Sequence, residues 1–129
     1  MTGNEVAVDT NRAVAILNGD AAALAWARTF TALYLPVTVL AELRYGALNS
    51  AKTAHNQQRV DDLATRFPVL DVTASTASAY AELRLALKKV GRPIPQNDLW
   101  IAATCIDHKL PLATADGHFD NLPGLTTVR

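Results

Sequence analysis

Four acidic residues, far apart in the chain, each adjoin or lie within an apolar segment: Asp9, Glu42, Asp98 and Asp116. Carboxylates that a fold brings together repel one another and raise each other's pKa, so such a cluster persists only if a positive group neutralises it. The usual neutralising group is a hard divalent cation, because it prefers oxygen ligands. If the fold brings these acids together, the chemistry to expect is metal-assisted catalysis.

Each acid, taken alone, also has a structural explanation. Asp9 precedes a predicted helix and suits an N-cap, and Asp98 is favoured near a helix N-terminus by the helix dipole. Asp116 and the glycine after it form a common turn signal. Glu42 lies opposite the apolar side of its helix and would be solvated there, although Gly46, a mid-helix glycine costing about 1 kcal/mol, points to a close approach one turn later. The alternatives stay open for single residues, whereas the combination of all four favours a site.

The segments that must position these acids alternate between short apolar runs and helical patterns. Strands are predicted over residues 5–9, 32–35, 67–72, 112–114 and 125–128, and helices over 10–17, 21–30, 52–66, 74–90 and 99–108, with one more helix from about residue 38. Short strands without polar alternation indicate a parallel sheet of four to five strands with helices on both faces, an α/β fold. A chain of 129 residues makes one such domain, residues 1–129. In this fold class, sites lie outside the carboxyl ends of the strands, which is where Asp9 and Asp116 fall.

Two helices are expected to bury a defined apolar stripe. The helix that begins near Thr38 carries its stripe at Leu40, Leu43, Ala47 and Leu48. The helix over residues 74–90 carries its stripe at Ala77, Tyr80, Leu83, Leu87 and Val90.

Composition excludes several other kinds of protein. The single cysteine, Cys105, lies in an apolar run and allows neither a disulfide framework nor a cysteine-based zinc site. No apolar run approaches the roughly 20 residues that cross a bilayer, and no secretion signal opens the chain, so a cytoplasmic protein without a membrane partner is expected. The three histidines, His55, His108 and His118, lack metal-binding spacing, and a surface position is predicted for each. Asp120 is a possible fifth acid at the rim of the site, although a cap or turn residue near Asn121 is the favoured interpretation.

Charge gives one local indication of nucleic-acid binding. Twelve basic and twelve acidic residues cancel, so no long-range attraction to RNA is expected. A short stretch without acids nevertheless carries four cations, Arg84, Lys88, Lys89 and Arg92, directly before the loop that leads to Asp98. These residues are predicted to position RNA through its phosphates. The alternative is a solvated helix end whose cations favour the helix dipole.

Four motifs, taken in order, resemble those of PIN-domain ribonucleases, with the greatest likeness to VapC toxins. They are Val8-Asp9-Thr10-Asn11, Leu40-Ala41-Glu42-Leu43-Arg44-Tyr45-Gly46, Asn97-Asp98-Leu99-Trp100-Ile101-Ala102-Ala103 and Thr114-Ala115-Asp116-Gly117-His118-Phe119. The resemblance covers almost the whole chain, and no acidic position departs from it. Ala115 is smaller than the polar residue that the family often carries there.

The resemblance implies a PIN-like three-layer fold and an acidic pocket that holds Mg²⁺ or Mn²⁺. Asp9, Glu42, Asp98 and Asp116 would be the catalytic, metal-binding acids, with Thr10, Asn97 and Thr114 as supporting residues. It also implies a homodimer, a cognate antitoxin that occupies the groove, and an RNA substrate, tRNA or rRNA.

The expected reaction follows from the kinds of residue present. Without a histidine pair to use the ribose 2′-hydroxyl, metal-activated water is the available nucleophile, and the products should carry 5′-phosphate and 3′-hydroxyl ends. Two alternatives stay open on the sequence alone. One is a catalytically silent PIN-like module that binds protein or nucleic acid, and the other is a different acidic-site hydrolase, such as a DNA-directed nuclease or a phosphatase.

Overall fold

The computed structural model describes residues 4–129, and its centre is a sheet of five parallel strands. The strands lie side by side in the order β3-β2-β1-β4-β5, so the first strand of the chain is the central one. Their bounds are β1 (Glu5–Val8), β2 (Ala32–Pro36), β3 (Val69–Leu70), β4 (Leu112–Ala113) and β5 (Thr127–Val128). Val6, Ala7 and Val8 are fully buried. Successive strand residues point to opposite faces, so both faces of the sheet are covered.

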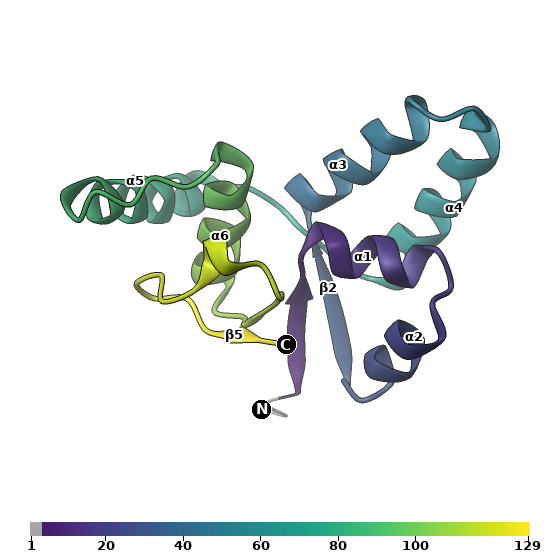
Figure 1. Cartoon of the computed structure of the whole chain (residues 1–129), viewed down its shortest axis with the longest axis horizontal. Coiled ribbons are helices and arrows are strands. Elements are labelled where there is room, and N and C mark those ends of the chain that lie inside the picture. Colours follow the sequence, from purple (N-terminus) through teal and green to yellow (C-terminus); the bar gives the residue numbers. More distant parts are fainter. Residues whose placement is uncertain (1–3) are drawn as a thin grey trace.

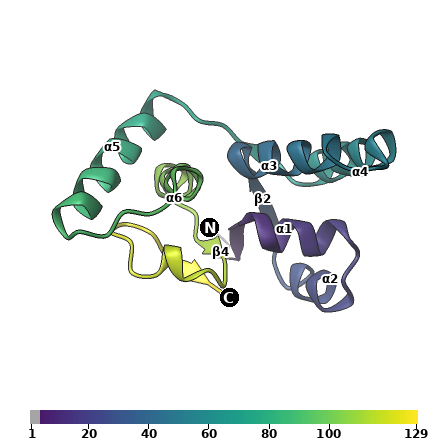
Figure 2. The same cartoon turned by 45° about the horizontal axis from the view of Figure 1, so that its top comes forward.

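The helices form two groups on either flank of the central strand (Figures 1 and 2). On one flank lie α1 (Thr10–Leu17), α2 (Ala21–Ala27), and the hairpin of α3 (Val37–Leu48) with α4 (Thr53–Arg66). On the other flank α5 (Ala74–Lys89) packs along α6 (Gln96–His108), and the short 3₁₀ helix η1 (Gly117–Phe119) contacts α6. The predicted α/β fold, a parallel sheet with helices on both faces, is therefore confirmed.

Several boundaries differ from the predicted ones. The helix predicted over residues 21–30 ends at Ala27, and the strand predicted over 67–72 is limited to Val69–Leu70. Helix α6 begins at Gln96 rather than near residue 99, because Pro95 occupies its N-cap position without a side-chain hydrogen bond. The ring of Pro95 fixes its φ, here −55°, and with a ψ of 146° the residue has the non-helical backbone that suits the position before a helix. As a result, Asp98 lies within the first helical turn.

Both predicted apolar stripes were partly wrong. Helix α3 buries Val39, Leu43 and Ala47, while Leu48 is 61% exposed, because the hairpin with α4 projects away from the sheet at that end (Figure 1). Helix α5 buries Thr76, Leu83 and Leu87 and leaves Ala77 and Val90 exposed. The buried Thr76 is satisfied because its hydroxyl donates to the carboxylate of Asp107 on α6, at 2.8 Å. A polar residue thus replaces an apolar one at this helix contact.

Among residues 4–129, no helix has both the length and the apolar composition that crossing a bilayer requires.

Candidate metal centre

The four predicted acids line one small pocket at the carboxyl ends of β1 and β4. Asp9 directly follows β1, Asp116 lies three residues after β4, Glu42 is on α3, and Asp98 is in the first turn of α6. The pocket has a volume of about 140 Å³, and Thr10, Asn11, Ile101 and Phe119 complete its lining. Four segments that are far apart in sequence therefore each contribute an acidic residue to one pocket.

Asp9 is the buried member of the group, with 5% of its surface exposed. One carboxylate oxygen, Oδ1, accepts a hydrogen bond from the backbone N–H of Arg12 at 2.9 Å and so caps α1. The other, Oδ2, accepts a hydrogen bond from the buried hydroxyl of Thr114 at 2.5 Å. The backbone N–H of Asp116 in turn donates to the Thr114 hydroxyl oxygen, at 3.0 Å. Asp9 therefore both caps α1 and lines the acid pocket. Thr114 connects Asp9 to Asp116 through its hydroxyl group.

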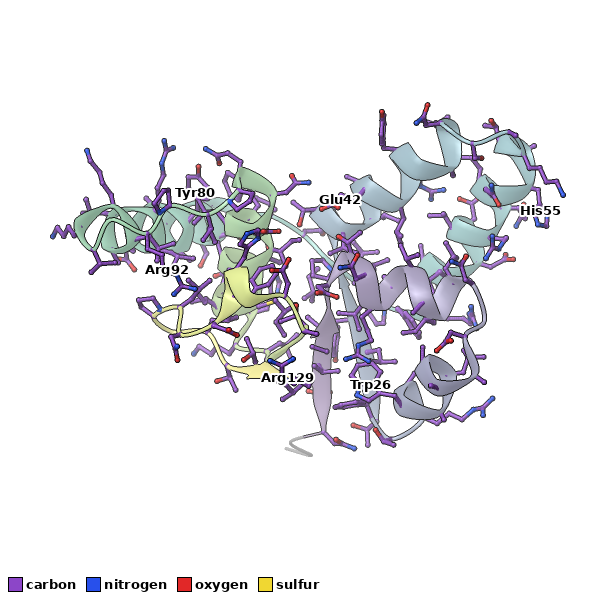
Figure 3. The ribbon with its side chains drawn as sticks, viewed as in Figure 1. Trp26, Glu42, His55, Tyr80, Arg92 and Arg129 are labelled. Carbon is purple, nitrogen blue, oxygen red and sulfur yellow. The ribbon has the colours of Figure 1, made fainter. Side chains whose placement is uncertain are left out.

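Glu42 faces α6 across the pocket (Figure 3), and its Oε1 accepts a hydrogen bond from the Asn97 side-chain amide at 2.9 Å. The predicted close approach at Gly46 was wrong for the described residues, because a Cβ at this position would meet no atom of theirs within 4 Å. Gly46 instead lines a second pocket of about 260 Å³ between α1, α3 and α4, to which Thr10 and Glu42 also contribute.

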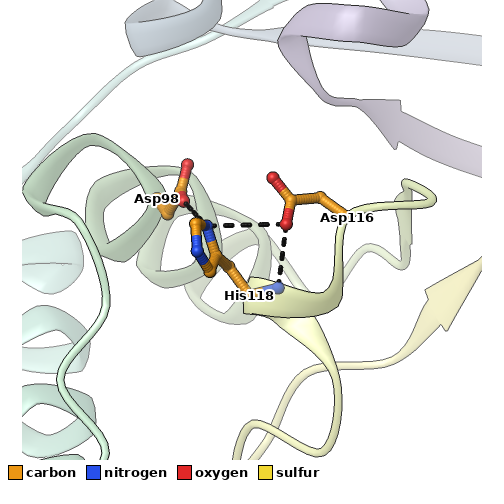
Figure 4. A group of neighbouring side chains, drawn as sticks. All are labelled: Asp98, Asp116 and His118. Atoms are coloured by element: carbon orange, nitrogen blue, oxygen red, sulfur yellow. Dashed lines mark hydrogen bonds and ion pairs between the residues drawn. The ribbon is translucent and has the colours of Figure 1, made fainter.

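The side chain of His118 contacts both Asp98 and Asp116 (Figure 4). The ring nitrogen Nδ1 of His118 lies 2.8 Å from Asp98 Oδ2 and 3.5 Å from Asp116 Oδ1. Burial raises the pKa of the Asp98 carboxyl, and the negative charges of Asp116 and Asp9 raise it further, whereas the hydrogen bond from His118 lowers it. The predicted surface position of His118 agrees with its side-chain exposure of 52%, but its contact with both acids was not predicted. The turn signal at Asp116-Gly117 was the available clue, because a tight turn returns the second residue after Asp116 toward the pocket.

Of the four cations predicted to position RNA, two line a common cavity and one contacts the backbone of η1. Arg84 and Lys88 line a cavity of about 410 Å³ together with Gln96. Arg92 instead lies beside η1 (Figure 3), and its Nη2 donates to the backbone carbonyls of Gly117 at 3.3 Å and His118 at 3.4 Å. Lys89 is exposed in the last turn of α5 and is not part of that cavity's lining.

The residues of the pocket suit a hard divalent cation. Carboxylate oxygens are the ligands that Mg²⁺ and Mn²⁺ prefer. Thr10 also lines the pocket, and its hydroxyl is buried and has no hydrogen-bond partner among the described residues. Buried polar atoms are normally satisfied, so this hydroxyl has capacity for a ligand or a water molecule in the pocket.

Comparison with known proteins agrees with this geometry. The PIN domain model matches residues 6–125. Ribonuclease VapC5 of Mycobacterium tuberculosis is 39% identical over 94 residues, which cover 71% of this chain and 70% of that protein. The chain belongs to the VapC family of PIN-domain proteins. The resemblance predicted from the four motifs is thereby confirmed.

Solved structures extend the likeness over nearly the whole PIN domain. A chain of VapBC2 from Rickettsia felis, in a crystal structure with a DNA fragment from the promoter, superimposes with a TM-score of 0.90 at 29% identity, covering 96% of this chain and 97% of that one. A chain of VapBC-5 from Mycobacterium tuberculosis superimposes with a TM-score of 0.77 at 30% identity, covering 98% of both chains. The PIN-like fold is common to all three.

Proposed function

We propose that this PIN-domain chain is the metal-dependent endoribonuclease toxin of a toxin–antitoxin pair. The observation that carries the proposal is the pocket in which Asp9, Glu42, Asp98 and Asp116 converge, in a chain of the VapC ribonuclease family. Convergent carboxylates need a neutralising cation, and cleavage of a phosphodiester needs the same cation to offset the charge of the phosphate. The pocket thus suits hydrolysis of RNA.

The four acids would hold Mg²⁺ or Mn²⁺, and their neighbours keep them oriented. When bound, such an ion supplies charge neutralisation at the phosphate and lowers the pKa of water toward neutrality. Thr114 fixes Asp9 by its hydrogen bond and holds the backbone of Asp116. Asn97 fixes Glu42 in the same manner. Because these partners are set before substrate arrives, little reorganisation is needed at the reaction itself.

The proposal includes partners. Structural relatives of this chain are VapBC complexes, and on that basis we propose a cognate antitoxin that occupies the groove at the acid pocket and a homodimer of this chain. Tyr45 and Leu48 lie one turn apart on α3 and are both exposed, and this apolar pair supports the presence of a protein interface. The whole chain, residues 1–129, would act as one PIN domain in the cytoplasm, with tRNA or rRNA as its substrate.

A cleavage assay tests the proposal. Purified protein should cleave RNA in the presence of Mg²⁺ or Mn²⁺ and stop when EDTA is added, leaving 5′-phosphate and 3′-hydroxyl ends. Asp98→Asn should lose the activity, and Asp62→Asn is the matched control, because Asp62 is an exposed acid on α4 whose carboxylate accepts a hydrogen bond from Gln58 on the same helix. Undiminished cleavage in chelator, by a preparation free of contaminating ribonuclease, contradicts the metal mechanism. Sequencing the RNA ends after induced expression identifies the target.

A further inference from the structure

The His118 ring lies at the edge of the acid pocket, against two of its lining carboxylates, in a way that the four-acid pattern does not require. Its Nδ1 lies between two carboxylates, 2.8 Å from Asp98 Oδ2 and 3.5 Å from Asp116 Oδ1 (Figure 4). One ligand-type atom from each of these three residues lies within 4.8 Å of the other two. The group combines two oxygen donors and one nitrogen donor.

The spacing of these atoms matches that of ligands around one ion. In an octahedral site with metal–ligand distances of about 2.1 Å, neighbouring ligand atoms are about 3 Å apart and opposite ones about 4.2 Å apart. The separations of 2.8 and 3.5 Å are those of neighbouring ligands, so an ion held by Asp98 and Asp116 lies within reach of Nδ1. The third pair, Asp98 and Asp116, lies within the 4.8 Å that bounds the group.

Both backbone polar groups of His118 form hydrogen bonds, which fixes the position from which its side chain extends. Its N–H donates to Asp116 Oδ1 at 2.9 Å, and its carbonyl accepts from Arg92 Nη2. Arg92 also donates to the carbonyl of Gly117, so a side chain from the loop after α5 holds two successive residues of η1. The short helix therefore presents Asp116 and His118 to the same point.

We propose that His118 is a nitrogen ligand of the ion in this pocket and gives the site a preference for Mn²⁺ over Mg²⁺. The inference rests on the proposed function, in which the acids hold a divalent cation. Mg²⁺ is strictly oxygen-seeking, keeps much of its water and rarely takes imidazole, whereas first-row transition ions accept both carboxylate and imidazole ligands. Four carboxylates alone would not favour Mn²⁺ over Mg²⁺ in this way, and the imidazole of His118 adds that preference.

The competing role for His118 is indirect. Its ring would then only donate a hydrogen bond to Asp98 and orient that carboxylate, as partners of metal ligands often do. In that case Mg²⁺ and Mn²⁺ would lose affinity equally when the ring is removed, because both ions use Asp98. The two roles therefore differ in metal selectivity.

The experiment uses the full chain and two matched variants. His118→Asn places an amide near the position of Nδ1 and keeps a hydrogen-bond donor for Asp98, but it removes the imidazole. His55→Asn is the control, because His55 is exposed on α4, far from Glu42 and the acid pocket (Figure 3). Binding of Mn²⁺ and of Mg²⁺ is measured by calorimetry, and pulsed electron paramagnetic resonance of the Mn²⁺-loaded protein detects nitrogen coupled to the ion.

We expect nitrogen coupling in the wild-type protein and in His55→Asn, and its loss in His118→Asn. The Kd for Mn²⁺ should rise by about tenfold or more in His118→Asn, while that for Mg²⁺ changes by no more than roughly twofold. Absence of nitrogen coupling in the wild-type protein overturns the inference without any variant. An equal loss of affinity for both ions in His118→Asn, or no loss for either ion, overturns it as well. A wild-type protein that binds neither ion would instead contradict the proposed function.

Discussion

The two halves of the acid pocket are built differently. On the side of β1 and β4, Asp9 and Thr114 are both 5% exposed, and each carboxylate oxygen of Asp9 already has a hydrogen-bond donor. On the side of α6 and η1, Asp98 and Asp116 are partly exposed, and their shared side-chain partner His118 is half exposed. The buried half fixes the geometry and contributes to folding. On the proposed function, we expect the open half to contribute less to folding and to be where the ion, substrate and solvent gain access.

The largest expected effect concerns activity and does not distinguish the halves. Asp9→Asn and Asp98→Asn should each lower kcat by about 100-fold or more, because each removes one negative oxygen donor of the proposed metal site. Single-turnover cleavage of RNA measures this effect, with Asp62→Asn as the control. A variant that cleaves at the wild-type rate returns its residue to a structural role.

Stability should separate the halves. Thr114→Val leaves Asp9 Oδ2 and the backbone N–H of Asp116 without their partner in a buried setting, and should cost about 1–3 kcal/mol of unfolding free energy. Asn97→Ala removes an exposed hydrogen bond to Glu42 and should cost no more than about 0.5 kcal/mol. Urea unfolding in EDTA compares the two variants. Equal losses would show that the two halves do not differ in this respect.

We also expect the cations near the open half to differ in function, with Arg84 and Lys88 acting in RNA binding and Arg92 in metal binding. Replacing Arg84 and Lys88 with alanine should weaken RNA binding and reduce the slope of its salt dependence by about 0.7 for each phosphate no longer neutralised, without moving the cleavage position. Arg92→Ala should instead weaken Mn²⁺ binding several-fold, since Arg92 holds the carbonyls of Gly117 and His118. RNA affinity against salt and metal affinity are measured for both variants. Identical behaviour would reject this division of roles.

The smallest effect is a pH dependence of the metal-free protein. The pKa of Asp98 is raised in the folded chain, so the folded state holds this proton more tightly than the unfolded state. The Asp98 contribution to stability is therefore present at low pH and is lost as pH rises through the folded pKa. In EDTA, Asp98→Asn should remove this loss, and unfolding measured from acid to neutral pH checks it. Added Mn²⁺ should reverse the loss in the wild-type protein, because the cation favours the ionised carboxylate.

Sequence reasoning reached the fold and the four acids, and it missed what depends on the detailed path of the chain. Short apolar runs before Asp9 and Asp116 were enough to predict a parallel sheet and a shared edge. The contact of His118 depends on how η1 turns, which no spacing rule encodes. The role of Arg92 could not be separated from that of Arg84 and Lys88, because all of them appear in sequence as one basic stretch. The exposure of Leu48 depends on where the α3–α4 hairpin leaves the sheet, which helical periodicity does not report.

The order of the strands has a consequence for synthesis of the protein. The central strand β1 is made first, while Thr114 and Asp116, which complete the pocket around Asp9, lie more than a hundred residues later. A ribosome-bound chain that lacks these residues has no complete set of acids. On the proposed function, a nascent chain that has not yet reached Asp116 is harmless, and a break in the message before the codon for Asp116 yields no toxin.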